Sequence, residues 1–210
     1  MNSRPTLNRS FLCRNYCFRI IICPVLSIFS IVDHIIFYKT IPINICSKNI
    51  EITYLCISYI TKSLAGFLQF YFTHIFDNVH LINTTSTSEM FEQLFRISSE
   101  DVLIPISFPR YSQRTLKAAK YARNKGADVI AITDCATSPL ASVANISLLA
   151  RSDMASFVDS LVAPLSVLNA LVVAVGLEKQ DEISQTYAQL ERIWDEYNVY
   201  EKTEDESFHV

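Results

Sequence analysis

The chain has 210 residues, of which 50% are hydrophobic, and a formal net charge of −3. This length allows one full-sized core and a short appendage, and this hydrophobic share excludes a chain that is disordered throughout. The charge is uneven: residues 1–64 carry 7 basic and 2 acidic side chains, whereas residues 65–210 carry 11 and 19, which argues against nucleic-acid binding by the surface of the larger part.

The composition changes near residue 64. Residues 1–64 contain no alanine and no glycine, but they hold five of the six cysteines and fourteen isoleucines. A globular segment of this length without either small residue is unusual. We therefore expect an atypical segment over residues 1–49, a folded domain over residues 50–178, and a C-terminal amphipathic helix with its tail over residues 179–210.

The first part of the chain combines four arginines with an apolar run. The run, Ile20–Val32, has thirteen residues without a charge, which is short for a bilayer span, and no small-residue cleavage site follows it. A cleaved secretory signal is therefore not expected, a membrane-associated segment stays open, and we expect a cytoplasmic protein without a membrane partner. Three cysteines of this part lack the spacing of a zinc site, so neither a metal site nor a disulfide framework is expected. They are Cys13, Cys17 and Cys23.

From residue 50 onward, short apolar runs alternate with amphipathic stretches. This alternation at βαβ spacing predicts an α/β fold with a parallel sheet covered by helices on both faces. The predicted strands are Ile50–Ile57, Val79–Ile82, Val102–Ile106, Asp128–Thr133 and Asn145–Ala150. The predicted helices are Ser63–Phe76, Glu89–Arg96 and a helix from Ser112 toward Gly126.

The stretch Asp101–Thr115 has the pattern of an anion site. A buried strand, Val102–Ile106, is followed by a loop and then by a helix with Ser112 in the position of an N-cap. The free N–H groups and the positive end of the helix dipole then face the crevice beyond the strand. Three hydroxyls and a guanidinium surround these N–H groups and can bind a phosphate, although serines at such turns are most often ordinary caps. They belong to Ser107, Ser112, Thr115 and Arg110.

Similar polar clusters follow two other strands. Six consecutive polar residues, Asn83–Ser88, follow the strand Val79–Ile82, and Asp134–Pro139 follows the strand Asp128–Thr133. In the second cluster, Ser138 before Pro139 predicts an N-cap and the first position of a helix. Since ligands of parallel sheets bind beyond the carboxyl ends of the strands, we expect these hydroxyls on one rim.

The C-terminal third contains two long apolar helices by prediction. Met154–Leu177 is apolar nearly all round, and its internal proline and asparagine favour a buried or subunit-facing helix over a membrane span. The second helix has an apolar stripe. One face of the sheet cannot cover the apolar surfaces of both helices, so a homodimer that buries them is expected. The stripe consists of Ile183, Tyr187, Leu190, Trp194 and Tyr197.

Several short stretches together resemble a known family. They are Ile75–Val79, Ile104–Ser112, Ala131–Asp134 with Ser138–Ala141, and Ser156–Ser160 with Ala163–Leu165. Over about residues 50–200 the chain resembles the sugar isomerase (SIS) domain of RpiR/MurR-type transcriptional regulators. The resemblance implies a three-layer α-β-α sandwich with a five-stranded, flavodoxin-like parallel sheet, usually dimeric, that binds a phosphorylated sugar or amino sugar without a cofactor or metal.

The resemblance also implies a set of ligand-binding residues. Ser107 and Ser112 match the family's phosphate-loop hydroxyls, whereas Pro109 and Arg110 stand where many SIS domains have Ser-Gly, and Ile57 stands at the glycine of the first-strand loop. The expected ligand-binding residues are Ser58, Ser63, Thr85, Ser86, Ser107, Arg110, Ser112, Thr115, Ser138 and Ser156.

Residues 1–49 show no recognisable helix-turn-helix, which family members carry before the sugar domain. Our hypothesis is a replaced, truncated or frame-shifted N-terminus, and DNA binding is expected only if a helix-turn-helix domain is present elsewhere. The predicted function is that of a ligand-sensing effector domain, with no catalytic residue. The alternatives are a sugar-phosphate aldose–ketose isomerase, for which Glu89, His80 and His74 are thin candidates for a base, and a degraded, non-functional SIS fragment.

Overall fold

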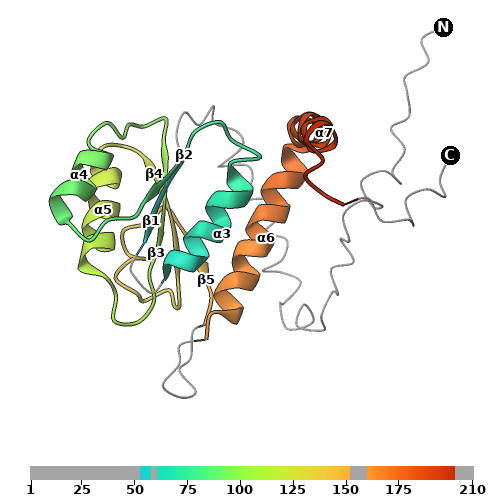
Figure 1. The fold of residues 1–210 in the computed structure, drawn as a ribbon. Helices are drawn as coiled ribbons and strands as arrows, with labels where there is room; N and C mark the ends of the chain where they lie inside the picture. The colour runs from blue at the N-terminus through green and yellow to red at the C-terminus, as the bar shows by residue number, and fades with distance from the viewer. Residues whose placement is uncertain (1–52, 58–60, 152–159, 202–210) are drawn as a thin grey trace, which may run out of the picture. The chain divides into compact units, whose positions relative to one another are not determined.

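Five parallel strands form the centre of the fold, in the order β2-β1-β3-β4-β5 (Figure 1). The computed structural model describes residues 53–57, 61–151 and 160–201. This order is that of flavodoxin-like sheets, and it confirms the predicted α/β class. The strands are β1 (Thr53–Ile57), β2 (Val79–Ile82), β3 (Val102–Ile106), β4 (Asp128–Thr133) and β5 (Ile146–Leu149).

Helices cover both faces of the sheet, which makes three layers. Helices α3 and α6 pack side by side on one face, and α4 and α5 pack on the other (Figure 1). Their bounds are Lys62–Phe72 for α3, Thr87–Leu94 for α4, Gln113–Asn124 for α5 and Val162–Glu178 for α6.

The central strand β3 is buried along its whole length, as its apolar sequence predicts. It pairs with β1 at every residue, but its pairing with β4 is recorded at Val102, Leu103 and Ile106 and not between them. Pro105 lies in this interval, and a proline has no N–H to donate to a neighbouring strand. The β3–β4 pairing is therefore interrupted just before the carboxyl end of β3.

The core between the sheet and helices α4 and α5 is built around Leu103, which is 0% exposed. Helix α5 turns three buried alanines toward this core, and such small side chains let the helix approach the sheet closely. The helix ends in a Schellman motif, in which Ala127 N–H donates to Ala122 O at 3.1 Å and Gly126 N–H donates to Arg123 O at 3.1 Å. Gly126 has a φ of 88°, a conformation that favours glycine.

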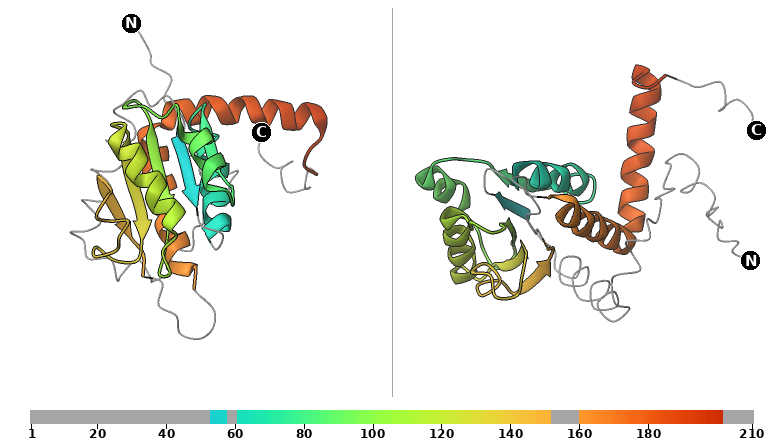
Figure 2. Two further views of the ribbon diagram at one scale, coloured as in Figure 1. Left: turned by 90° about the vertical axis from the view of Figure 1, so that its left-hand side faces the viewer. Right: turned by 90° about the horizontal axis from the view of Figure 1, so that it is seen from below.

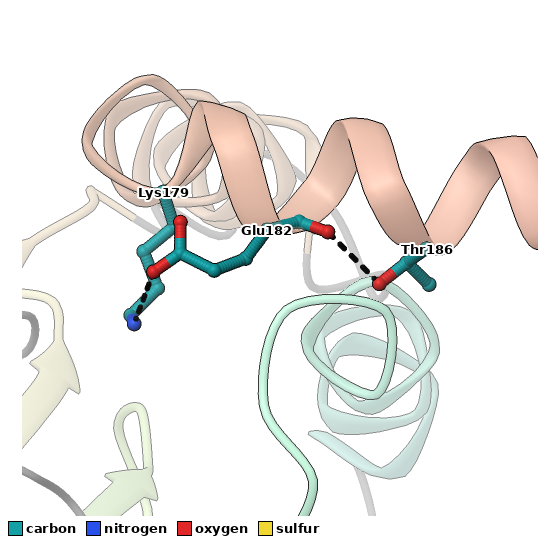
Figure 3. Close-up of polar contacts among 3 residues, drawn as sticks. All are labelled: Lys179, Glu182 and Thr186. Atoms are coloured by element: carbon teal, nitrogen blue, oxygen red, sulfur yellow. Dashed lines mark hydrogen bonds and ion pairs between the residues drawn. The ribbon is translucent and has the colours of Figure 1, made fainter.

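Helix α7 (Gln180–Tyr197) follows α6 after a bend of 97° and extends away from the sheet (Figure 2). At the bend, Lys179 Nζ and Glu182 Oε1 form an ion pair at 3.2 Å, and the Thr186 hydroxyl donates to Glu182 O at 3.0 Å (Figure 3). Tyr187 stacks on His74, which follows α3, with ring centroids 5.6 Å apart. The first two contacts stabilise the bend and the first turns of α7, and the ring contact joins α7 to the segment that follows α3.

One predicted helix is absent from the part of the chain that the structure describes, and several boundaries differ from the sequence prediction, among them the end of α4 at Leu94, the bounds of β5 and the start of α6 at Val162. The helix predicted after Pro139 is absent from the described residues; this segment forms successive turns, in which the Ser138 hydroxyl accepts from Ala141 N–H at 3.1 Å. The local capping signal is thus present, but only a few residues separate this turn from β5. Helix α3 ends at Phe72 rather than Phe76, and α4 begins at Thr87, two residues before Glu89.

Several predictions fall outside the described residues. They concern the atypical segment 1–49 with its cysteines, residues 50–52 of the first strand, and residues 154–159 of the helix predicted from Met154. Over the ranges that the structure describes, no single helix is long and apolar enough to cross a membrane; α6 and α7 reach that composition only as a bent pair. In the same ranges, no group of three or more histidine, cysteine, aspartate or glutamate residues is placed to hold a metal ion.

Replacing Leu103 by alanine should lower the free energy of unfolding by about 2–5 kcal/mol, because the change leaves a cavity in the core. Urea denaturation followed by circular dichroism measures this loss. Leu149→Ala is the matched control: Leu149 is 44% exposed on the edge strand β5, so the same change should cost less than about 1 kcal/mol. Equal losses for the two variants would contradict this assignment of the core.

Candidate anion-binding site

The loops that follow β2, β3 and β4 all leave the same edge of the sheet, because the strands are parallel. We call this edge the carboxyl rim and define it as residues 83–86, 107–112 and 134–138. Six of the ten predicted ligand-binding residues belong to it. They are Thr85, Ser86, Ser107, Arg110, Ser112 and Ser138.

The turn between β3 and α5 is organised by two serine hydroxyls. Ser107 is buried, and its N–H donates to Ile132 O of β4 at 3.0 Å, which fixes the start of the turn. The Ser107 hydroxyl accepts from Ser112 N–H at 3.2 Å, and the Ser112 hydroxyl accepts from Thr115 N–H at 3.3 Å. Ser112 is therefore the N-cap of α5, as its sequence position predicts.

Donors remain at the N-terminus of α5 after this capping. Within the described residues, the main-chain N–H groups of Gln113 and Arg114 have no acceptor. The Thr115 hydroxyl is 0% exposed and likewise has no hydrogen-bond partner there. An unpartnered buried hydroxyl is uncommon in folded proteins, and it lies in the first turn of the helix that carries the free N–H groups.

The charges at the start of α5 differ from those at the start of α4, the helix packed beside it. The first turn of α5 contains Arg114 and no acidic residue, whereas the first turn of α4 contains Glu89. A cation at a helix N-terminus opposes the helix dipole and is unfavourable unless an anion joins it. Arg114 also donates through Nη1 to Thr84 O at 3.1 Å, which ties α5 to the loop after β2.

Arg110 occupies the tip of the β3–α5 turn in a left-handed conformation, with a φ of 64°. This conformation costs an L-residue roughly 1–2 kcal/mol, and it is held by the hydrogen bonds on both sides of the turn. The side chain is exposed. Backbone strain of this kind persists where the surrounding structure over-determines it, which is common at binding sites.

A tyrosine connects the turn to the next strand. The Tyr111 hydroxyl donates to Asp134 Oδ1 at 2.8 Å, and the buried Thr133 hydroxyl donates to the same oxygen at 3.1 Å. Burial, and then the bond to Asp134, raise the pKa of Tyr111 well above its ordinary value of 10.0. Burial also acts to raise the pKa of Asp134, but the hydrogen bonds that its carboxylate accepts from Tyr111, Cys135 and Thr133 outweigh burial and lower it below 3.8. The rim therefore contains a fixed, ionised carboxylate beside the cationic turn.

The start of α3 joins the same edge. The Thr61 hydroxyl donates to Ile106 O, at the end of β3, at 3.2 Å. Because this hydroxyl is directed to β3, α3 has no side-chain cap. Ser63 is exposed in the first turn of α3.

The structure thus brings together part of the predicted ligand set. Ser107, Arg110 and Ser112 lie in one turn, and Thr115 follows in the first turn of α5. Ser86 and Ser138 lie on the same edge, but their hydroxyls accept hydrogen bonds from N–H groups of their own segments, at 3.5 Å from Glu89 and 3.1 Å from Ala141. Thr85 is exposed beside Ser86. Ser58 and Ser156 lie outside the described residues.

Three residues of this site were not predicted from the sequence: Tyr111, Asp134 and Arg114. Tyr111 and Asp134 are 23 positions apart, and no local pattern indicates that they meet. Arg114 could have been found, because an arginine in the first turn of a helix without an acidic residue is an unfavourable placement that suggests an anionic partner.

Comparisons with known proteins bear on the family and the fold. Residues 59–174 match the family model of the SIS domain. No curated protein sequence matches the chain. The fold is similar to that of the sugar isomerase domain of an RpiR transcription factor from Sphaerobacter thermophilus, with a TM-score of 0.67 and 19% identity over 74% of this chain and 86% of that one.

Two further solved structures are similar and contain ligands. The Vibrio vulnificus NanR protein complexed with ManNAc-6P has a TM-score of 0.57 and 17% identity, over 72% of this chain and 60% of NanR. The Escherichia coli CFT073 protein c3406 in complex with A5P has a TM-score of 0.57 and 16% identity, over 74% and 84%. At these identities the likeness establishes the fold.

Replacing Asp134 by asparagine should destabilise the chain in a pH-dependent manner. Since folding lowers the pKa of Asp134, its carboxylate stabilises the folded state at every pH above its unfolded value near 3.8, and this contribution is lost as the pH falls through the lower folded value. The difference in stability between the wild type and Asp134→Asn should therefore be constant near neutrality and shrink below about pH 4. Thermal denaturation between pH 3 and 7 measures it, and a difference that grows with acidity would contradict the assignment. In a Tyr111→Phe background the difference should be smaller throughout.

Proposed function

Because this chain belongs to the SIS domain family, we propose that it binds a phosphorylated sugar or amino sugar at the carboxyl rim, with the phosphate at the β3–α5 turn. The observation that carries the proposal is the N-terminus of α5. There, two main-chain N–H groups without acceptors in the described residues lie at the positive helix end, Arg110 belongs to the preceding turn, and the first turn of α5 contains Arg114 and no acidic residue.

A phosphate monoester fits this arrangement for electrostatic reasons. Its oxygens accept several hydrogen bonds at once, and its two negative charges match the helix end and the guanidinium groups. Each serine hydroxyl of the turn accepts one hydrogen bond from an N–H group. It can still donate its own hydrogen to the ester, because a hydroxyl donates and accepts at the same time. The sugar would then extend from the turn toward the loops after β1 and β2.

We assign this site to an effector domain of an RpiR/MurR-type regulator, in which binding changes conformation and no bond is broken. The support is the likeness to the RpiR sugar isomerase domain and to NanR, which is complexed with ManNAc-6P. DNA binding by this protein would require a helix-turn-helix domain outside the described residues. A cytoplasmic location follows from this role.

The second candidate function is aldose–ketose isomerisation of the same ligand. Glu89, in the first turn of α4, is the one carboxylate of the β2–α4 junction, and Thr84 donates a hydrogen bond to it. Isomerisation needs a base beside the carbonyl of the substrate, and glutamate is a common choice. We rank this second because that carboxylate already accepts hydrogen bonds from the Thr84 hydroxyl and the Gln93 side-chain amide.

The chain should be stabilised by phosphorylated sugars and not by their unphosphorylated forms. At a concentration of a hundred times the dissociation constant, a ligand adds about 2.7 kcal/mol to the apparent stability. Differential scanning fluorimetry against ManNAc-6P, glucosamine 6-phosphate and fructose 6-phosphate, each beside its free sugar, measures this. No stabilisation by any of them would favour a fragment that has lost the site, and product formation in excess of enzyme would favour the isomerase.

Arg110→Gly is the matched variant for that experiment. Glycine adopts a positive φ without steric cost, so this change relieves the backbone strain at the tip of the turn. It removes a charge-assisted bond to the phosphate, and affinity should fall about tenfold or more. Lys120→Gly is unsuitable as a control, because a glycine there would break α5. Arg123 is exposed at the far end of the helix, so the control Arg123→Gln should keep the wild-type affinity.

We also propose that the chain is a homodimer associated through α6 and α7. Large apolar side chains are exposed on these helices, among them Leu177 at 60% and Ile193 at 48%, and water contact with such a surface is unfavourable. Leu177→Glu combined with Ile193→Glu should therefore convert a dimer into a monomer at micromolar concentration, as measured by sedimentation velocity. The control is Phe95→Glu, an exposed apolar residue beside α4 on the other face of the sheet; it should remain dimeric, and a monomeric wild type would overturn the proposal.

A further inference from the structure

The β3–α5 turn has a conformation that its own residues do not favour. Arg110 has a φ of 64°, and the residues on both sides of it are not glycines that would relax the strain. A turn of this kind needs external contacts to keep one conformation, because each strained residue is otherwise free to return to a lower-energy region. Two such contacts flank Arg110 in the structure.

The first contact is internal to the turn, where Ser112 N–H donates to the Ser107 hydroxyl at 3.2 Å. The second comes from another strand: the Tyr111 hydroxyl reaches Asp134 Oδ1 at 2.8 Å. Asp134 directly follows β4, and its oxygen is fixed in turn by the Thr133 hydroxyl at 3.1 Å. Tyr111 thus attaches the second half of the turn to the end of β4, whereas Ser107 N–H, which donates to Ile132 O, attaches the start of the turn.

Tyr111 lies between the strained residue and the helix cap. Movement of its ring would shift Arg110 on one side and Ser112, with the free N–H groups of α5, on the other. The Asp134 carboxylate is ionised at neutral pH, and the hydrogen bonds that it accepts lower its pKa further. A hydrogen bond to a charged group is stronger than one between neutral groups.

We propose that the Tyr111–Asp134 hydrogen bond is a positioning clamp, which holds the β3–α5 turn in the conformation that receives a phosphate group. This inference rests on the proposed function. Tyr111 and Asp134 act through the turn, as positioning residues, and the clamp sets the affinity of the site rather than supplying a contact to the ligand.

The experiment measures the binding of inorganic phosphate to the full chain by isothermal titration calorimetry, with the melting temperature of each unliganded variant recorded in parallel. Tyr111→Phe removes only the hydroxyl, and affinity for phosphate should fall about tenfold. Tyr121→Phe is the matched control, since the Tyr121 hydroxyl donates to Phe95 O at 3.5 Å, away from the rim; its affinity should equal that of the wild type.

Two variants of Asp134 separate the hydrogen bond from the charge. Asp134→Asn and Asp134→Leu both remove the negative charge, but only asparagine keeps an oxygen that accepts from Tyr111. The asparagine variant should therefore bind phosphate about fivefold or more tightly than the leucine variant, and adding Tyr111→Phe to Asp134→Leu should weaken binding no further. A purely structural role would lower the melting temperatures without this non-additive pattern in affinity.

The outcomes distinguish the two proposals. If the wild type does not bind phosphate, the proposed function fails and the clamp fails with it. If the wild type binds and Tyr111→Phe binds equally well, the clamp is overturned while the proposed function stands. If Tyr111→Phe does not fold, equal affinity of Asp134→Asn and Asp134→Leu overturns the clamp by itself.

Discussion

Parallel pairing of β3 with β1 on one side and β4 on the other is the constraint on which the rest of this structure depends. Because all five strands run in one direction, each loop that leaves a strand and each helix that follows begin at the same edge of the sheet. The positive ends of α3, α4 and α5 therefore converge there. The gathering of positive helix ends at this edge is a consequence of the topology, and the side chains decide how each helix end is completed.

The N-termini of the helices at this edge differ in how they are capped. Ser86 and Glu89 complete the first turn of α4, and the hydroxyl of Thr61 is directed to β3. At α5, Ser112 satisfies one N–H group and leaves others, while Arg114 adds a positive charge. Such a start is unfavourable in isolation, and bonds to the loops after β2 and β4 hold it in place. An anion bound at this helix start would offset the unfavourable charge.

The two faces of the sheet are also covered differently. Helices α4 and α5 pack their apolar sides on the sheet and turn charged residues outward, as in α5 with Lys117, Lys120 and Arg123. Helix α6 is apolar on nearly all sides, and its exposed residues include Val162 at 73% and Leu177. The face formed by α3 and α6, with α7 beyond it, therefore has the composition of a contact surface, whereas the opposite face has that of a solvated one.

The sequence by itself determined the class of fold, the buried strand β3, and the Ser112 cap that begins α5, because strand burial, helix periodicity and N-capping depend on residues only a few positions apart. It was misleading at Pro139, where a correct capping signal is followed by turns instead of a helix. Only the tertiary structure decided the strand order, the Arg114–Thr84 bond and the Tyr111–Asp134 bond, whose partners lie 30 and 23 positions apart. Contacts at such separations are set by which strands become neighbours, and no local pattern of residues encodes that choice.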